Sequence, residues 1–436
     1  MEACTSPTGG IYRPRQPRKS PLYQCIRRHV DELRAAGSIH RAVEENTLER
    51  FLDCGDLHKG FARVYCRQCR HDYLLAFSCK TRGLCPSCHQ KRMFAHGEWV
   101  EAYVLAPVPH RQYVFTLPKL LRPHFHYRPH LGELCRLVAL LLKSAFKAAE
   151  PCGEPAFILY VQTYGDLVTW NPHIHALVAD GVFLPNGTFR VLPPIPEALL
   201  NARLREAVLS FLTEEGSLDP LLAERMRRWQ HSGFSVHNRV KVQARDTDAR
   251  QRLARYMNRA PFSLDKMTYD TSSATVIYRS KLHATLKRNF QLMPGAQWLK
   301  LLLQHIPDRY EHLIRYYGYY SNRSRGQRAK QSQPPGSPES ESSQTIDEPA
   351  HCKAAKAAWA RLIKKIYEVD PMVCPRCGGE MRIIALIEQP CVIQRILKHL
   401  GAWEPRPSGP DPPSGPAAWP SGVTLPLTYH PVPDIA

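Results

Sequence analysis

The chain has 436 residues, 43% of them apolar and 9% aromatic, which is enough for roughly two to four domains with buried cores. Lysine and arginine outnumber aspartate and glutamate by 59 to 39, and the net charge of +20 makes a polyanion, above all nucleic acid, the expected partner. The longest aliphatic run, Leu137–Leu142, is far shorter than the ~20 residues that cross a bilayer, and the N-terminus has no apolar signal. We therefore expect a soluble, unexported protein with no membrane partner.

Changes in composition divide the chain into segments of different expected behaviour. They are a basic, flexible arm over 1–38, a zinc-binding domain over 39–95, an α+β body over 96–320, a disordered linker over 321–352, a module over 353–401 and a proline-rich tail over 402–436. The arm is expected to be mobile because its basic stretch contains prolines and no acid. The tail contains ten prolines and is expected to be extended.

Hydrophobic periodicity predicts the elements of the body in chain order. A helix is predicted over His89–Ala106, leading out of the cysteine-rich region. Strands are predicted at Gln112–Leu117, Phe157–Tyr164, Ile174–Phe183, Val236–Val242 and Thr275–Tyr278. Further helices are predicted at Leu131–Glu150, Pro196–Glu215, Leu218–His231 and Asp248–Arg259.

The cysteine-rich region has the spacing of a zinc site. Two CxxC pairs, Cys66 with Cys69 and Cys85 with Cys88, stand fifteen residues apart, and two such turns can offer four thiolates to a tetrahedral Zn²⁺. Other residues are possible alternative ligands or members of a second site: Cys54, Cys79, His58 and His71. The sequence therefore predicts at least one structural zinc ion.

A further CxxC pair, Cys374 with Cys377, lies in the C-terminal module and has no obvious second pair. Cys352 and Cys391 are possible partners. A turn of the same shape without metal explains the spacing equally well.

Two His-x-His motifs occur, and their contexts differ. His124 and His126 lie in a basic stretch broken by prolines, which predicts a surface or phosphate-contacting loop. His173 and His175 enter an apolar run, so period two places both imidazoles on one face of a strand, with Ile174 in the core behind. Two neutral imidazoles on one face are typical of a metal site.

A divalent cation such as Mg²⁺ or Mn²⁺ on His173 and His175 would keep open positions and could polarise a phosphate oxygen. Gln162, on the preceding predicted strand, is a candidate third ligand, although an ordinary hydrogen-bonded strand glutamine is nearly as good an explanation. The chain has neither GxxxxGK[ST] nor GxGxxG, so no nucleotide cofactor is expected.

Strand transfer without a nucleotide needs a covalent intermediate that conserves phosphodiester energy, and hence a nucleophile. The predicted helix Asp248–Arg259 offers Tyr256, flanked by Arg252, Arg255 and Arg259. Arginines at this spacing can hold DNA phosphates and stabilise a developing phenolate. A tyrosine on an amphipathic helix is more often a core residue, so the assignment depends on its combination with the His-x-His strand.

Several stretches together resemble the HUH single-strand transposases of the insertion-sequence ninety-one family and the related common-region (ISCR) elements. The matching stretches are Phe77–Cys88, Asn171–Phe183, Leu253–Phe262, His312–Gly318, Val369–Gly379 and His399–Gly401. The motifs occur in the family's order and cover about residues 40–320 and 359–401.

The resemblance implies an N-terminal zinc-binding domain followed by a nuclease domain with a central antiparallel sheet flanked by helices. It also implies a divalent metal at His173 and His175, Tyr256 as the nucleophile, and rolling-circle transposition of single-stranded DNA in the bacterial cytosol, in association with the nucleoid. In the family's chemistry the tyrosine takes the 5′ phosphate and leaves a free 3′ hydroxyl. Members with two tyrosines carry the second four residues away; here those positions are Arg252 and Ala260, which resembles the single-tyrosine branch.

The sequence therefore predicts an α+β, metal-dependent strand transferase that binds, cleaves and rejoins single-stranded DNA at transposon ends and targets. A zinc-containing DNA-binding protein without catalysis would explain the charge and the cysteines, but not the His-x-His strand or Tyr256. A hydrolytic nuclease would need the metal and no tyrosine. Trapping a covalent protein–DNA adduct distinguishes the three alternatives.

Overall fold

The computed structural model describes residues 16–280, 289–331 and 371–403. Over these residues the chain is an α+β protein whose three sheets are antiparallel, as predicted. The first 15 residues, most of the predicted linker and the tail after residue 403 lie outside the described residues. Within the described ranges, no helix combines the length and apolarity needed to span a membrane.

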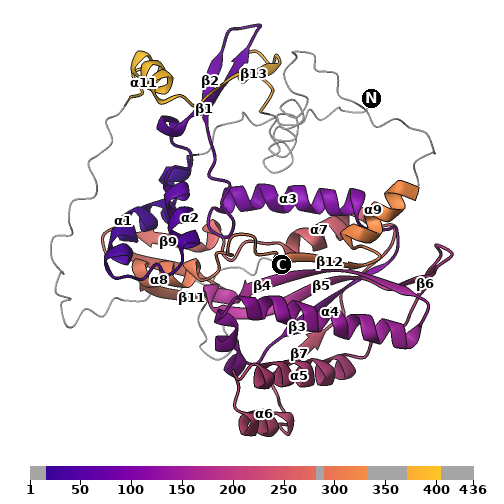
Figure 1. Cartoon of the computed structure of the whole chain (residues 1–436). Helices are drawn as coiled ribbons and strands as arrows, with labels where there is room; N and C mark the ends of the chain where they lie inside the picture. The colour runs from indigo at the N-terminus through magenta and orange to yellow at the C-terminus, as the bar shows by residue number, and fades with distance from the viewer. Residues whose placement is uncertain (1–15, 281–288, 332–370, 404–436) are drawn as a thin grey trace, which may run out of the picture.

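The largest sheet forms the centre of the molecule (Figure 1). Its main strands pair in the order β12 (Ile314–Gly318), β4 (Glu154–Tyr164), β5 (Trp170–Phe183), β3 (His110–Thr116) and β7 (Ser235–His237). Two short strands, β6 (Phe189–Val191) and β8 (Lys241–Val242), extend β5 and β3 respectively. The long central strands β4 and β5 are buried almost throughout, because helices cover both faces.

One face of the large sheet is covered by α4 (Pro129–Ala149), α5 (Glu197–Glu214) and α6 (Pro220–Arg227), and the other by α3 (Pro86–Tyr103) and α7 (Thr247–Met257) (Figure 1). Alternation along β5 explains the two cores: Ile174 belongs to the core under α4, and Leu177 to the core under α3 and α7. The sheet thus presents one defined face to α7.

A second core lies beside the large sheet. It joins α1 (Pro21–Ala35), α2 (Ala42–Leu52) and α8 (Gly295–Leu303) to the sheet of β9 (Met267–Asp270), β10 (Thr275–Arg279) and β11 (Phe290–Pro294). The prediction of a flexible arm over residues 1–38 was wrong for the part that α1 occupies. The positive charges of α1 flank an apolar stripe that includes Leu22, Ile26 and Leu33, and this stripe is fully buried.

A small sheet stands apart from this body (Figure 1). Its strands pair in the order β13 (Met381–Ile387), β1 (Phe61–Cys66) and β2 (Asp72–Ala76), and α11 (Pro390–His399) packs nearby. The C-terminal strand therefore completes a sheet that begins in the N-terminal part of the chain. The sequence did not predict this pairing.

Short elements complete the described chain. The 3-10 helices are η1 (Pro17–Lys19), η2 (Leu57–Lys59), η3 (Lys119–His126), η4 (Asp166–Val168) and η5 (Leu264–Lys266). Helix α9 (Asn322–Gln331) occupies the start of the predicted linker, so the prediction of disorder was wrong for these residues. Stacking of its Arg328 on Tyr319, 3.5 Å from the ring centroid, attaches it to the body.

Candidate metal and nucleophile site and thiolate clusters

His173 and His175 lie side by side on β5, as the alternation predicted. Both side chains are buried on the face that α7 covers, and their ring centroids are 4.9 Å apart. Burial lowers the pKa of His173 to about 4 and that of His175 to about 3. Both imidazoles are therefore neutral at physiological pH, which is the form that binds a metal ion.

Hydrogen bonds from β5 itself and from β3 orient the two rings. Nδ1–H of His173 donates to the carbonyl of Asn171 at 2.7 Å, which leaves its Nε2 as an acceptor. Nδ1 of His175 lies 2.9 Å from Nε2 of Gln112 on β3, while Nε2 of His175 is buried and has no hydrogen-bond partner among the described residues. Sequence reasoning missed Gln112; its signal is a glutamine in a strand that is otherwise largely apolar.

Gln162 is the residue opposite His173 in the β4–β5 pairing. Its side-chain Nε2 donates to the carbonyl of Met257 at 2.6 Å, and its Oε1 is buried with no hydrogen-bond partner in the part of the chain that the structure describes. A buried amide oxygen and a buried imidazole nitrogen without partners lower the stability of the folded state, unless each interacts with a bound water or ion. The ring nitrogens and the amide oxygen match the donor set of a divalent cation.

Tyr256 stands at the end of α7, directly over this strand face. Its ring meets the ring of His175 edge to face, with centroids 5.8 Å apart, while 46% of the residue remains exposed. Helix α7 is held against α3, where Gly97 allows close contact: a Cβ there would lie 2.7 Å from Cγ of Arg255. The buried pair of Arg250 and Glu101 fastens the same two helices. We call the set of His173, His175, Gln162 and Tyr256 the strand site.

The three arginines near Tyr256 have different environments. Arg259 lies over the Tyr256 ring at 4.7 Å and over Tyr164 at 5.8 Å, and its Nε has no hydrogen-bond partner. Arg255 stacks on Phe94 at 4.6 Å. Arg252 is exposed one helical turn before Tyr256. Arg259 is therefore the cation in direct contact with the phenol ring.

A cavity of about 350 Å³ borders Gln162 and Arg259. Among its other basic lining residues are Arg82, Arg92 and Arg128. Arg128 is paired with a carboxylate of Glu311 at 2.7 Å, whereas Arg92 is exposed. The space beside the strand site is thus predominantly basic.

The other His-x-His motif has no comparable geometry. His124 and His126 lie on η3, which contains Pro123. The His126 ring stacks on Trp170 at 4.4 Å, and the His124 carbonyl accepts a hydrogen bond from His130. This motif is a local packing feature near the surface, consistent with the choice between the two motifs.

Eight of the described cysteines form two separate groups of four. In the first thiolate cluster, Cys54, Cys79, Cys85 and Cys88 place their sulfur atoms within 4.8 Å of one another. Cys85 is the N-cap of α3 and Cys88 lies in its first turn, so this cluster sits where α3 begins. Hydrogen bonds, first from Cys54, lower the pKa of the Cys88 thiol, which favours the thiolate form that zinc binds.

The predicted set of Cys66, Cys69, Cys85 and Cys88 was wrong as a single site. Cys66 and Cys69 instead lie with Cys374 and Cys377, and we call this group of four the second thiolate cluster. The physical reason is the hairpin of β1 and β2, which carries the first CxxC turn away from the start of α3 (Figure 1). Cys54 and Cys79, predicted as alternative ligands or members of a second site, complete the first cluster.

Other proposed ligands lie outside both clusters. Nδ1–H of His58 donates to the carboxylate of Asp56 at 2.8 Å, and its ring packs at a tilt against the ring of Trp403. Cys391 is exposed on α11, and His71 contributes its backbone carbonyl to the turn that follows Cys66. Cys352 lies outside the described residues.

Comparison with known proteins supports both halves of this description. Residues 25–117 match the family model described as a transposase zinc-binding domain, and residues 156–328 match one described as a putative transposase. The chain is 29% identical over 364 residues to the transposase for insertion sequence element IS801 of Pseudomonas savastanoi pv. phaseolicola, covering 80% of this chain and 85% of that protein. It is 26% identical over 333 residues to the putative transposase y4qJ of Sinorhizobium fredii, covering 70% and 81%.

No solved structure matches the chain. The zinc-binding model spans the first thiolate cluster and the first half of the second, and the transposase model spans β4, β5 and α7. The sheet that carries the strand site and the cysteine-rich region before it thus correspond to the two parts of one known enzyme architecture. The chain belongs to the IS91 family of transposases and carries that family's zinc-binding domain in its N-terminal part.

Proposed function

We propose that this transposase cleaves and rejoins single-stranded DNA through Tyr256, at a phosphate held beside His173, His175 and Gln162. The observation that carries the proposal is the position of Tyr256, an exposed phenol packed edge to face on His175. It lies above Nε2 of His175 and Oε1 of Gln162, two buried atoms that have no hydrogen-bond partner among the described residues. A nucleophile beside a candidate metal site is the arrangement that phosphodiester transfer requires.

The residues of the strand site fit a divalent cation. Nε2 of His173, Nε2 of His175 and Oε1 of Gln162 would be its ligands, and Mg²⁺ or Mn²⁺ there would polarise the scissile phosphate. For His175 to ligate through Nε2, its Nδ1 must carry the proton, and the Gln112 amide would turn over so that its oxygen accepts it. His173 already has the required arrangement.

The reaction itself is an exchange of esters. The phenol oxygen of Tyr256 attacks phosphorus, a tyrosyl–phosphate bond forms to the 5′ side, and the bond from phosphorus to the 3′ oxygen breaks. The 3′ oxygen leaves as a hydroxyl after taking up a proton, and the phenol proton passes to solvent. One phosphodiester replaces another, so no nucleotide is consumed, and attack by a 3′ hydroxyl on the tyrosyl phosphate rejoins a strand.

Charge and exposure support the choice of Tyr256. Arg259 on its ring can stabilise the developing phenolate, and exposed Arg252 and Arg92 can hold neighbouring phosphates. Two other tyrosines near this part of the chain are poor candidates, because Tyr269 and Tyr278 are buried. We propose that the protein acts on this DNA in the bacterial cytosol, at the nucleoid.

The test is to trap the covalent adduct. Purified protein is incubated with Mg²⁺ or Mn²⁺ and single-stranded oligonucleotides from the ends of its own element, denatured, and digested for mass spectrometry. We expect a DNA-linked peptide containing Tyr256, and Tyr256→Phe should bind DNA and fold normally yet give neither cleavage nor adduct. Tyr103→Phe, at an exposed tyrosine of α3, is the matched control and should keep full activity.

Three outcomes would contradict the proposal. Cleavage by Tyr256→Phe with a free 5′ phosphate would indicate hydrolysis, and an adduct on Tyr269 or Tyr278 would identify another nucleophile. DNA binding by the wild type without cleavage of any end sequence would favour a binding protein.

A further inference from the structure

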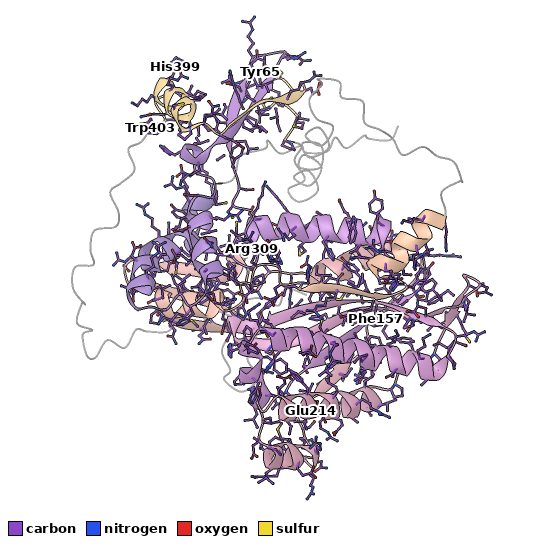
Figure 2. The ribbon with its side chains drawn as sticks, viewed as in Figure 1. Tyr65, Phe157, Glu214, Arg309, His399 and Trp403 are labelled. Atoms are coloured by element: carbon purple, nitrogen blue, oxygen red, sulfur yellow. The ribbon has the colours of Figure 1, made fainter. Side chains whose placement is uncertain are left out.

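The second thiolate cluster joins parts of the chain that are distant in sequence. Strand β1 lies in the middle of the small sheet, with its hairpin partner β2 on one side and the C-terminal β13 on the other. The β1–β13 register pairs Phe61 with Ile387 and Cys66 with Met381. Figure 2 shows Tyr65 on this sheet and labels His399 and Trp403 of the C-terminal segment at the same end of the molecule. Trp403 packs against the small core that contains Phe61.

Both CxxC pairs form the same kind of turn at the end of a strand. The backbone N–H of Cys66 donates to the carbonyl of His71 at 2.8 Å, and Arg70 has a φ of +59°. In the C-terminal turn the N–H of Cys374 donates to the carbonyl of Gly379 at 2.7 Å, and Gly378 has a φ of +72°. Two tight turns of this form face each other, each presenting two sulfur atoms.

The sulfur positions fit one tetrahedral ion. Sγ of Cys66 lies 3.6 Å from Sγ of Cys377, Sγ of Cys69 lies 3.5 Å from Sγ of Cys374, and all four are within 4.8 Å of one another. Zinc–sulfur bonds of ~2.3 Å in a tetrahedron place sulfurs ~3.8 Å apart. The spacing is that of a four-thiolate zinc site, and it is too long for a disulfide at ~2.0 Å.

Hydrophobic packing is too small to explain why the cysteines are together. The buried core of this end of the sheet consists of Val64, Cys66, Cys374 and Met381, so half of it is cysteine. Cys377 is exposed and contributes nothing to a core. The β1–β13 pairing and a second small core around Phe61 also join the two segments, but neither explains why four sulfur atoms meet at this end of the sheet, whereas one shared metal ion does.

We propose that Cys66, Cys69, Cys374 and Cys377 bind a second structural Zn²⁺, which fastens the C-terminal module to the N-terminal hairpin. The ion completes a zinc ribbon whose two halves come from opposite ends of the folded chain. The matched zinc-binding domain ends at residue 117 and so contains only half of these ligands. The complete zinc-binding unit therefore includes residues of the C-terminal module.

The first test counts zinc in the full-length protein by native mass spectrometry. We expect two ions in the wild type, and one in the Cys374→Ser/Cys377→Ser double variant. The matched control is Cys152→Ser/Cys391→Ser, which removes two exposed cysteines outside both clusters and should retain two ions.

The second test asks whether the ion bridges the two segments. A specific protease site is inserted near residue 340, in the stretch that composition marks as a linker, and the zinc-loaded protein is cut and passed through a sizing column. The two fragments should elute together in the wild type. They should separate after chelation, and separate without chelation in the Cys374→Ser/Cys377→Ser variant.

Each test can overturn the proposal. A wild type with one zinc ion, or a double variant that keeps two, would show that these thiolates do not bind the metal. Disulfides among these four cysteines in anaerobically purified, denatured protein would show that covalent bonds, and not a zinc ion, join the two turns. Fragments that separate in zinc-loaded protein would show that the ion does not hold the module.

Discussion

The strand site and the first thiolate cluster both gather metal-ligand side chains, yet the chain holds them by different means. His173 and His175 sit on a strand buried between two helical layers, and backbone pairing fixes their spacing. The first thiolate cluster collects residues from the region after α2, a loop and the start of α3. Geometry at the strand site is set before any metal binds, whereas thiolates brought together without metal repel one another.

Helix α3 connects the two regions. It begins at Cys85 and packs along its length against α7, which carries Tyr256. Substitution of the candidate ligands of the strand site should therefore lower strand cleavage without lowering the free energy of unfolding. Loss of the first thiolate cluster should lower the free energy of unfolding and should affect the position of Tyr256 only indirectly. Four predictions test this contrast.

The largest effect is expected at the strand histidines. His173→Ala or His175→Ala should lower strand cleavage by more than ~100-fold, because changes even outside the ligand shell of a metal cost ~10 to 100-fold. The melting temperature and the DNA affinity should change little. His124→Ala is the control from the other His-x-His motif; an equal loss of cleavage there would refute the distinction between the two motifs.

Removal of the first thiolate cluster should act on stability. Cys85→Ser/Cys88→Ser should lose one zinc ion and lower the free energy of unfolding by more than ~4 kcal/mol, the range typical of a lost metal site. Urea denaturation followed by tryptophan fluorescence measures this, with Cys152→Ser as the control. Because the cluster borders the core formed with α1 and α8, a variant of unchanged stability would show that this core alone suffices.

Gln162 offers a smaller and more discriminating test. Gln162→Leu removes both the oxygen ligand and the hydrogen bond to Met257, whereas Gln162→Glu keeps an oxygen, loses the donor and adds a negative charge. If the side chain is a ligand, Gln162→Leu should lower cleavage by ~10 to 100-fold and Gln162→Glu by much less. Equal impairment of the two variants would mean that the contact with α7 is its only role.

The smallest effect concerns the pH dependence of the free energy of unfolding. Burial lowers the pKa of His110 on β3 to about 3. Between about pH 6.5 and pH 3 this histidine is therefore protonated in the unfolded chain and neutral in the folded chain. This histidine favours folding above that window, and its contribution is lost as the pH falls through it, by ~1.4 kcal/mol per pH unit.

His110→Gln should therefore flatten the fall in urea midpoint between pH 6.5 and 5, whatever its effect at neutral pH. The exposed His231→Gln is the control and should leave the slope unchanged. If the slope is unchanged in His110→Gln, the acid sensitivity arises at other groups, for example the buried His173 and His175.

Much of the strand site could be predicted from sequence because its signals are local. The alternation around Ile174 placed both histidines on one face, and the helical pattern placed Tyr256 beside Arg259. The support from Gln112 and the contact between Gln162 and Met257 could not be predicted, since they depend on which strands become neighbours and on where α7 ends.

By itself, the sequence determined the α+β class, the main strands and helices of the body and the CxxC turns, because each depends on residues within a few positions of one another. Only the tertiary structure decided which cysteines share a site: Cys66 and Cys69 lie closer in sequence to Cys85 than to Cys374, yet the β1–β2 hairpin directs them toward β13. It also decided that α1 is a core helix, because its apolar stripe needed α8 and β9 to cover it. Spacing along the chain indicates which turns can bind metal, and only the path of the backbone between them determines which turns meet.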